Sequence, residues 1–399
     1  MRTQPVLAGL VLAVVGFASS FAVVLAGLRA AGASQAQAAS GLLALSVAMG
    51  LTAVWLSLRH RMPISVVWST PGAALLASVG GHSFQAAVGA FLVTGLLLVV
   101  TGLSATLTRA LRAIPTPVAS AMLAGVLVPL CLAPVQAVVR YPAEATPTVL
   151  VWLVLTRFAR RWAVPGALLA ALPGILGHSP SYEGPALVFT TPTLSAGAVV
   201  GIAVPLFIVT MAAQNVPGLA MLKSYGYEPP LRPLLTGTGA ATVLVAPFGG
   251  HAVNLAAITA ALAAGPDAGP DRSRRWIASV TGGIAAVALG LSAGLAAGLI
   301  ESAPPLLIEA VAGLALLGTL GSALQATVGD EAAIITFVVT VSGIAPLGIG
   351  APFWGLLAGL AFRIAMRRPR PADLDAADEP SPIRGPDADP PVRTLTPSE

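Results

Sequence analysis

Long apolar runs recur along the whole chain, and they limit its fold more than any other feature of the sequence. Runs of about 18 or more mostly apolar residues are long enough to cross a lipid bilayer as helices. Charged residues supply only 9 % of the 399 positions and hydrophobic residues 56 %, whereas a soluble domain contains about 25 % charged residues. The sequence therefore predicts an all-α polytopic membrane protein.

The two ends of the chain differ in composition. Residues 6–28 form an apolar run that is too long for the core of a typical signal peptide, so it is expected to remain as the first membrane helix. Residues 369–399 are rich in proline, aspartate, alanine and arginine, and predict a disordered cytoplasmic tail. Cys131 is the single cysteine, which excludes an intramolecular disulfide and a thiolate metal site. No metal, cofactor or nucleic-acid partner is expected.

Hydropathy and helix breakers divide the apolar part of the chain into about fourteen segments. The segments are residues 6–28, 37–58, 64–79, 84–108, 116–136, 147–161, 163–178, 197–222, 231–246, 249–264, 274–300, 304–321, 330–344 and 348–367. The third, tenth and thirteenth of these are too short to cross the bilayer as straight helices. We therefore expect interruptions in the membrane for some of them.

Basic residues fall mainly on one side of this arrangement, and the positive-inside rule assigns that side to the cytoplasm. The inner side would hold Arg2, Arg59, Arg61, Arg109, Arg112, Arg157, Arg160, Arg161, Lys223, Arg232, Arg272, Arg274, Arg275 and the basic C-terminal end. The outer side would hold only Arg29 and Arg140. Both termini are therefore expected in the cytoplasm of a bacterial-type cell, with the protein in the inner membrane.

Three pairs of strings match across the two halves of the chain, and the members of each pair lie seven segments apart. Residues 113–128 match 302–317, residues 162–172 match 348–360, and residues 67–78 match 244–257. Because seven is odd, matching segments cross the membrane in opposite directions, which predicts two inverted repeats of seven segments. Chance similarity among helices rich in Ala, Gly and Leu is the alternative.

Segments three and ten carry breaks at Thr70-Pro71-Gly72 and at residues 247–250. Unpaired backbone groups cost several kcal/mol in hydrocarbon, so such breaks are expected only beside a cavity or packed protein. The β-branched and aromatic residues before each break, 64–68 and 242–245, predict short extended pieces. The small residues after each break predict half-helices, whose N-termini would meet in the membrane and attract an anion. Inverted repeats with interrupted helices are typical of secondary transporters.

Polar residues in segment ten are the strongest candidates for ligand binding. Gly249 and Gly250 would let the backbone approach a ligand, and His251 and Asn254 would share one face of the following half-helix. Ionisable groups at membrane depth are costly and usually functional. The alternative is that His251 caps or hydrogen-bonds locally without meeting the substrate.

Segments one and eight supply further candidates. Gln214 and Asn215 lie beside a Pro-Gly pair in segment eight, and they indicate either a binding site or hydrogen bonds between helices. Phe17, Ser20 and Phe21 would suit a planar aromatic ligand, although scattered phenylalanines in a core are commoner.

Glu309 is the one carboxylate well inside a predicted span, and Asp330 and Glu331 begin segment thirteen. A carboxyl group in an apolar helix is a candidate proton carrier, or it forms a protonated hydrogen bond to a neighbouring helix. Asp330 is a good helix N-cap. For proton coupling, His251 is the first candidate because imidazole titrates near neutral pH, and Glu309 is the second.

Several strings resemble a known family, the benzoate/proton symporters of the BenE type. They are "FIVTMAAQNVPGLAML", "APFGGHAVNLAAITAAL", the "GPDAGPDRSRRW" after it, "STPGAALL" and "GIGAPFWGLLAGL". The resemblance covers residues 5–368 and implies the fold of the uracil/proton symporter and of prestin-like anion transporters. It implies a core domain of residues 1–112 and 197–301 that moves against a gate domain of residues 113–196 and 302–368. The substrate would lie between the half-helices of segments three and ten.

The resemblance implies import of benzoate or a similar aromatic monocarboxylate together with a proton, by alternating access, with a homodimer as a possible assembly. The substrate-binding candidates are Ser69, Thr70, Pro71, Gly72, Gln214, Asn215, Gly249, Gly250, His251, Asn254, Phe17, Ser20 and Phe21. In nucleobase transporters of this fold, acidic residues on segments eight and ten bind the substrate. Here the corresponding places hold the Gln214–Asn215 pair and His251 with Asn254, which favours an anion over a nucleobase as the substrate. An uncoupled anion channel or exchanger of the same fold is the alternative. An intramembrane hydrolase is disfavoured, because no His-Glu-x-x-His string occurs.

Overall fold

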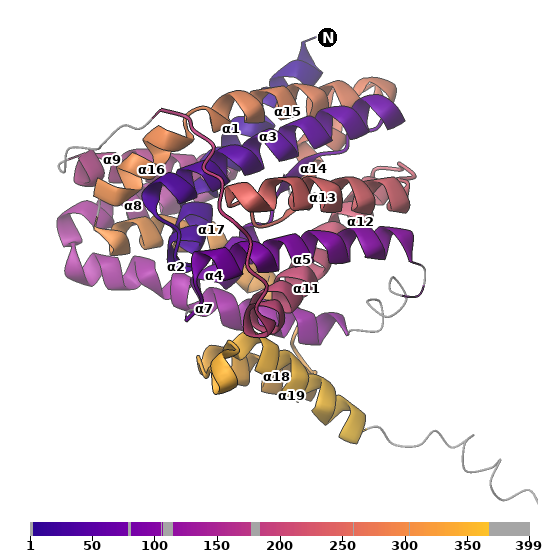
Figure 1. Ribbon diagram of the computed structural model, residues 1–399. Coiled ribbons are helices and arrows are strands. Elements are labelled where there is room, and N and C mark those ends of the chain that lie inside the picture. The colour runs from indigo at the N-terminus through magenta and orange to yellow at the C-terminus, as the bar shows by residue number, and fades with distance from the viewer. Residues whose placement is uncertain are drawn as a thin grey trace, which may run out of the picture.

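The computed structural model describes residues 3–78, 81–104, 106, 115–176, 184–257, 259–302 and 304–366 (Figure 1). These residues are mostly helical, with one pair of short strands. Among them, six stretches are long and apolar enough to cross a membrane, namely Gln4–Ala30, Gln35–His60, Phe84–Leu103, Thr116–Arg140, Ala196–Ser224 and Pro305–Gln325. The prediction of a mostly helical membrane protein is therefore confirmed. The predicted tail, 369–399, lies outside the described residues.

The elements follow the predicted segments closely, with extra breaks. The first half contains α1 (Gln4–Ala18), α2 (Phe21–Ala30), α3 (Gln35–His60), β1 (Val66–Trp68), α4 (Thr70–Ala77), α5 (Phe84–Leu103), α7 (Thr116–Arg140), α8 (Pro142–Phe158) and α9 (Ala163–Leu176). The second half contains α10 (Ala196–Ala198), α11 (Val204–Thr210), α12 (Val216–Ser224), α13 (Leu231–Val245), β2 (Val253–Leu255), α14 (Ala260–Ala264), α15 (Trp276–Gly290), α16 (Ala293–Ser302), α17 (Pro305–Gln325), α18 (Glu331–Val341) and α19 (Ala351–Ala365).

Two of the membrane segments are irregular at polar residues. The first segment bends at Ser19 and Ser20, which separate α1 from α2. Segment eight runs from α10 to α12 through two wider π-helical turns, and the second of these, Met211–Asn215, contains both predicted amides. Such turns inside α-helices are frequent at functional sites because they redirect side chains.

Glycine contacts let four long helices pack at close range. A Cβ atom on Gly283 of α15 would lie 2.6 Å from the main-chain oxygen of Gly50 in α3. A Cβ atom on Gly239 of α13 would lie 2.9 Å from the main-chain oxygen of Gly95 in α5. Small residues are typical of membrane helix contacts, since they allow the backbones to approach. The pairs α3–α15 and α5–α13 are therefore packed backbone against backbone.

The strands β1 and β2 pair in antiparallel fashion at the centre of the molecule, with Val67 opposite Asn254. Two further main-chain bonds extend the ladder, from Ser69 N–H to Ala252 O and from Ala256 N–H to Ser65 O, each 2.9 Å. The extended piece predicted at 64–68 is therefore confirmed. It is followed by α4, as expected.

Segment ten differs from the prediction. Residues 242–245 belong to the helix α13, and the extended piece lies after the glycines, at β2, rather than before them. Gly249 adopts a left-handed φ of 88° and turns the chain into this strand. The short helix α14 begins only at Ala260. The expectation that His251 and Asn254 share a half-helix face is wrong, because Asn254 is in the strand and His251 precedes it.

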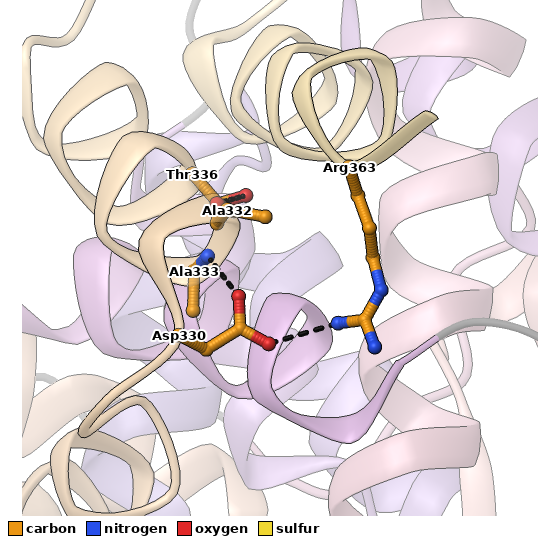
Figure 2. A network of polar contacts seen from close by, with 5 residues as sticks. All are labelled: Asp330, Ala332, Ala333, Thr336 and Arg363. Carbon is orange, nitrogen blue, oxygen red and sulfur yellow. Dashed lines mark hydrogen bonds and ion pairs between the residues drawn. The ribbon is translucent and has the colours of Figure 1, made fainter. Parts of the chain in front are cut away.

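The helices α18 and α19 pack on each other and on α7 at one edge of the molecule, opposite α1, α3 and α15 (Figure 1). Figure 2 shows how the pair is held: Asp330 Oδ1 accepts from Ala333 N–H at 3.0 Å and Oδ2 from Arg363 Nη1 at 2.8 Å. The N-cap role predicted for Asp330 is confirmed. On the facing side, Gly355 and Gly359 of α19 pack against Thr340 and Thr336 of α18.

Candidate functional site

A cavity of about 500 Å³ lies beside β1 and the first turn of α4, and helices from both halves of the chain form its walls. It is lined by parts of α1, α3, α7, α15 and α17 together with segment eight. Its lining includes Leu12 of α1, Met49 of α3 and Ser279 of α15. These positions lie toward the end of the bundle where Arg61 stacks 4.5 Å over the ring of Trp276. The cavity therefore extends from the central strands toward that end.

One wall of the cavity is the β1–α4 junction. Residues 65–68, Thr70 and Pro71 line the cavity. In an antiparallel ladder the N–H groups of alternate residues point away from the partner strand. Because Val67 faces Asn254 in the ladder, the N–H groups of Val66 and Trp68 point away from β2, on the outer edge of β1.

The opposite edge of the ladder is held by side chains from two other segments. Asn215 Oδ1 accepts from Leu255 N–H at 2.9 Å, and Thr242 Oγ1 accepts from Val253 N–H at 2.9 Å. Asn215 and Thr242 are fully buried. These bonds satisfy strand donors that would otherwise cost several kcal/mol inside a membrane. Asn215 therefore lies behind the strands rather than on the cavity wall.

Ser69 joins the two interrupted segments. Its Oγ accepts from Gly72 N–H at 3.1 Å as the N-cap of α4, and it also accepts from Thr210 Oγ1 at 3.0 Å. His251 Nε2 lies 2.9 Å from Ser69 O. Because a carbonyl can only accept, this nitrogen carries the proton, and Nδ1 is buried with no hydrogen-bond partner among the described residues. With its amide oriented to match its neighbours, Asn254 accepts from Ser69 N–H at 3.1 Å.

An aromatic corner borders the cavity. Phe17 lines the cavity, stacks on Phe21 at 5.6 Å between centroids and meets Trp68 edge-on at 5.5 Å. Trp68 Nε1 donates to Ser20 Oγ at 2.9 Å, which ties the break between α1 and α2 to β1. Ser20 lines the cavity, whereas Phe21 only supports Phe17 from behind.

The remaining polar lining consists of uncharged groups. Gln214 is half-buried on the wall, and no described residue hydrogen-bonds its amide. Hydroxyl groups missed by the sequence analysis also line the cavity: Ser65, Thr116, Ser120, Thr259, Ser279, Thr319 and Ser322. No titratable side chain is among the described lining residues. Single hydroxyls in small-residue helices carry no pattern that would have identified them from the sequence.

The structure thus divides the predicted binding residues into two groups. Phe17, Ser20, Thr70, Pro71 and Gln214 line the cavity. The others are buried and do not line it: Ser69, Gly72, Asn215, Gly249, Gly250, His251, Asn254 and Phe21.

The prediction that Gly249 and Gly250 let the backbone approach a ligand is wrong, because both glycines pack against protein atoms. A Cβ on Gly249 would meet α3, at 3.1 Å from Gln37 O, and a Cβ on Gly250 would meet Val245. These glycines therefore serve a turn and close helix packing.

Glu309 lies apart from this cavity. It is half-buried near the start of α17, in a second cavity of about 330 Å³ that Arg29 also lines. The two proton-coupling candidates, His251 and Glu309, are therefore in different parts of the fold.

Residues 1–365 match the family model described as "Benzoate membrane transport protein" (BenE). The chain is 38 % identical over 367 residues to the inner membrane protein YdcO of Escherichia coli, covering 88 % of this chain and 93 % of that protein. It is 30 % identical over 338 residues to the benzoate membrane transport protein of Acinetobacter baylyi, covering 82 % of this chain and 86 % of that protein.

Solved anion transporters have a similar fold. SLC26A9 matches with a TM-score of 0.60 at 13 % identity, over 90 % of this chain and 64 % of that chain, so this chain spans less than two thirds of its length. The transmembrane domain of the cyanobacterial bicarbonate transporter BicA matches with a TM-score of 0.59 at 16 % identity, over 90 % of this chain and 97 % of that one.

Proposed function

Because the chain belongs to the benzoate membrane transport family, we propose that it imports benzoate, or a similar aromatic monocarboxylate, together with a proton by alternating access. The resemblance read from the sequence strings is confirmed by the family match. The protein is a membrane transporter rather than an enzyme.

The observation that carries the proposed substrate is the composition of the cavity wall. The cavity is lined by hydrogen-bond donors without a formal charge and by the ring of Phe17. The donors are the Gln214 amide, the outer edge of β1 and the first turn of α4. A carboxylate would accept hydrogen bonds from these groups and face the positive end of the α4 dipole. The aromatic ring would pack against Phe17 and Trp68, as rings prefer in offset or edge-on contacts.

The proposed alternating access is movement of a core against a gate, in a fold of two inverted repeats. The central pairing supports this, because β1 and β2 face each other in an antiparallel ladder and Val67 and Asn254 are 187 positions apart, close to the separations of the matching glycines. The string match of 67–78 with 244–257 is offset from this pairing by about ten positions. The glycine contacts support it too, since α3–α15 and α13–α5 are equivalent pairs. Gly50 matches Gly239 and Gly95 matches Gly283 at separations of 189 and 188 positions. The core would comprise residues 1–112 and 197–301, and the gate 113–196 and 302–368.

The proposed topology places the mouth of the first cavity on the cytoplasmic side, with both termini, in a bacterial-type inner membrane. The positions of Arg61 and Arg275 at that end of the bundle support this orientation. His251 and Glu309 remain the candidates for the proton, and a homodimer remains a prediction.

The test is uptake of radiolabelled benzoate into proteoliposomes with an imposed pH gradient, with protein-free liposomes correcting for passive entry of the neutral acid. We expect accumulation that requires an acidic outside and that excess unlabelled benzoate inhibits. Accumulation of uracil or sulfate instead of benzoate would refute the substrate. Benzoate flux that ignores the gradient would indicate the uncoupled channel or exchanger.

A further inference from the structure

A second cavity of about 330 Å³ lies at the opposite end of α2 and α17 from the mouth of the first. It is formed where α2 ends and α17 begins, with contributions from α3 and α16. Leu25 and Ile308 supply apolar surface, and Gln35, Arg29 and Glu309 supply polar groups. In the proposed topology this is the outer face of the protein, at the boundary between core and gate.

A packed layer separates the two cavities. On α2 the first cavity ends at Ser20 and the second begins at Leu25, and the intervening residues 21–24 are buried. On α17 the second cavity ends at Glu309 and the first begins at Ala315, and residues 310–314 are buried. On α2 and α17, a layer of buried residues therefore lies between these two cavities.

The charged residues of the second cavity suit an anion site whose net charge depends on the protonation of Glu309. Arg29 is permanently charged, and its planar guanidinium matches a carboxylate in a bidentate geometry. Among the described residues, Arg29 and Glu309 are the charged groups of the lining, and no ion pair joins them. An ionised Glu309 makes the lining neutral overall and repels a carboxylate, whereas a protonated Glu309 leaves the full positive charge of Arg29.

Other charged groups near this end of α17 belong to a different face. Tyr141, at the α7–α8 junction, packs against the cluster of Leu307 and Ala310, Arg140 lies over the Tyr141 ring, and Glu144 lies against Gly174 of α9. None of these three lines the cavity. The described residues of α9 carry no charge. Glu301, in the last turn of α16, is a further acidic position near the start of α17 in the sequence.

We propose that this second cavity captures an aromatic monocarboxylate anion on Arg29, and that it does so only while Glu309 is protonated. The proposal rests on the proposed function and adds an outer binding site to it. The ring of the substrate would pack against Leu25 and Ile308. A falling outer pH would increase capture, because it protonates Glu309 and so leaves the charge of Arg29 available.

The test is the KM for exchange of labelled against unlabelled benzoate in proteoliposomes, at equal pH on both sides, between pH 5.5 and 8. For the wild type we expect the KM to rise about tenfold or more with pH. Glu309→Gln should keep the low KM of the acidic condition at every pH. Arg29→Gln should show a KM at least about tenfold above wild type at pH 5.5, with Arg29→Lys recovering part of the loss.

Glu144→Gln is the matched control and should retain the wild-type pH profile. The proposal is overturned if Glu309→Gln keeps that profile, if Arg29→Gln has an unchanged KM, or if the control abolishes the dependence. A wild-type protein that exchanges no benzoate would instead refute the proposed function. Arg29 is exposed at a helix end, so Arg29→Gln keeps the test decisive even if the Glu309 variant does not fold.

Discussion

His251 and Ser69 connect the two interrupted segments directly, since the imidazole Nε2–H donates to the main-chain oxygen of Ser69 across 2.9 Å. Ser69 is also the N-cap of α4 and the acceptor of the Thr210 hydroxyl. The position of the first turn of α4, which lines the cavity, therefore depends on residues of segments eight and ten that do not touch the cavity themselves.

Removing this bond should weaken the junction. We expect His251→Ala to lower the thermal unfolding temperature, because it removes a buried hydrogen bond worth about 0.5–1.5 kcal/mol and leaves Ser69 O with Ala73 N–H as its remaining partner. His251→Gln, which keeps a side-chain donor, should recover part of the loss. Unfolding in detergent, followed by the fluorescence of the tryptophans, measures both. An Ala variant as stable as the wild type would contradict the supporting role of His251.

The adjacent amides Gln214 and Asn215 should respond differently to the same substitution. Asn215→Ala removes the buried acceptor of Leu255 N–H and should destabilise the protein by about 1–3 kcal/mol. Gln214→Ala should leave the unfolding temperature nearly unchanged and raise the KM for benzoate, because its amide faces the cavity. Transport kinetics and thermal unfolding of both variants provide the comparison. A stability loss in Gln214→Ala, with a raised KM but normal stability in Asn215→Ala, would contradict this assignment of the two amides.

Alanine substitution should affect stability very differently at two glycines, one in a close helix contact and one facing open space. Gly283→Ala places a methyl group 2.6 Å from the backbone oxygen of Gly50 and should cost about 1–3 kcal/mol through overpacking. Gly318→Ala on α17 meets no atom within 4 Å and should be neutral or slightly stabilising, because Ala favours a helix. Thermal unfolding and the yield of monodisperse protein distinguish them. Equal behaviour of the two variants would argue against close packing of α3 and α15.

The Asp330 carboxylate combines a helix cap with a surface ion pair, and the two can be separated. Asp330→Ala loses both, and we expect a loss of about 1 kcal/mol, mainly from the cap. Asp330→Asn keeps a capping side chain and loses only the pair with Arg363, which is 49 % exposed, so its effect should stay below about 0.5 kcal/mol. Chemical denaturation of the two variants compares the contributions. A large effect of the Asn variant would show that the ion pair dominates.

Hydropathy located the helices well because the free energy of placing a side chain in a bilayer depends mostly on that side chain. The breaks in segments three and ten were also predictable, since Pro71 and the Gly249–Gly250 pair disfavour continuous helix wherever they stand. The strand at 253–255 was not predictable. A run as short as Val253–Asn254–Leu255 fits a helix or a strand equally well, and only pairing with β1 decides between them.

The sequence by itself determined the class of the protein, the approximate position of its spans and the polar residue types available inside the membrane. The tertiary structure alone decided which of those polar residues face a cavity. Asn215 accepts a hydrogen bond from the backbone N–H of Leu255, forty positions away, whereas its neighbour Gln214 lines the cavity. Inside a membrane every backbone donor needs a partner, and which side chain supplies it depends on contacts between distant segments that a local sequence pattern does not contain.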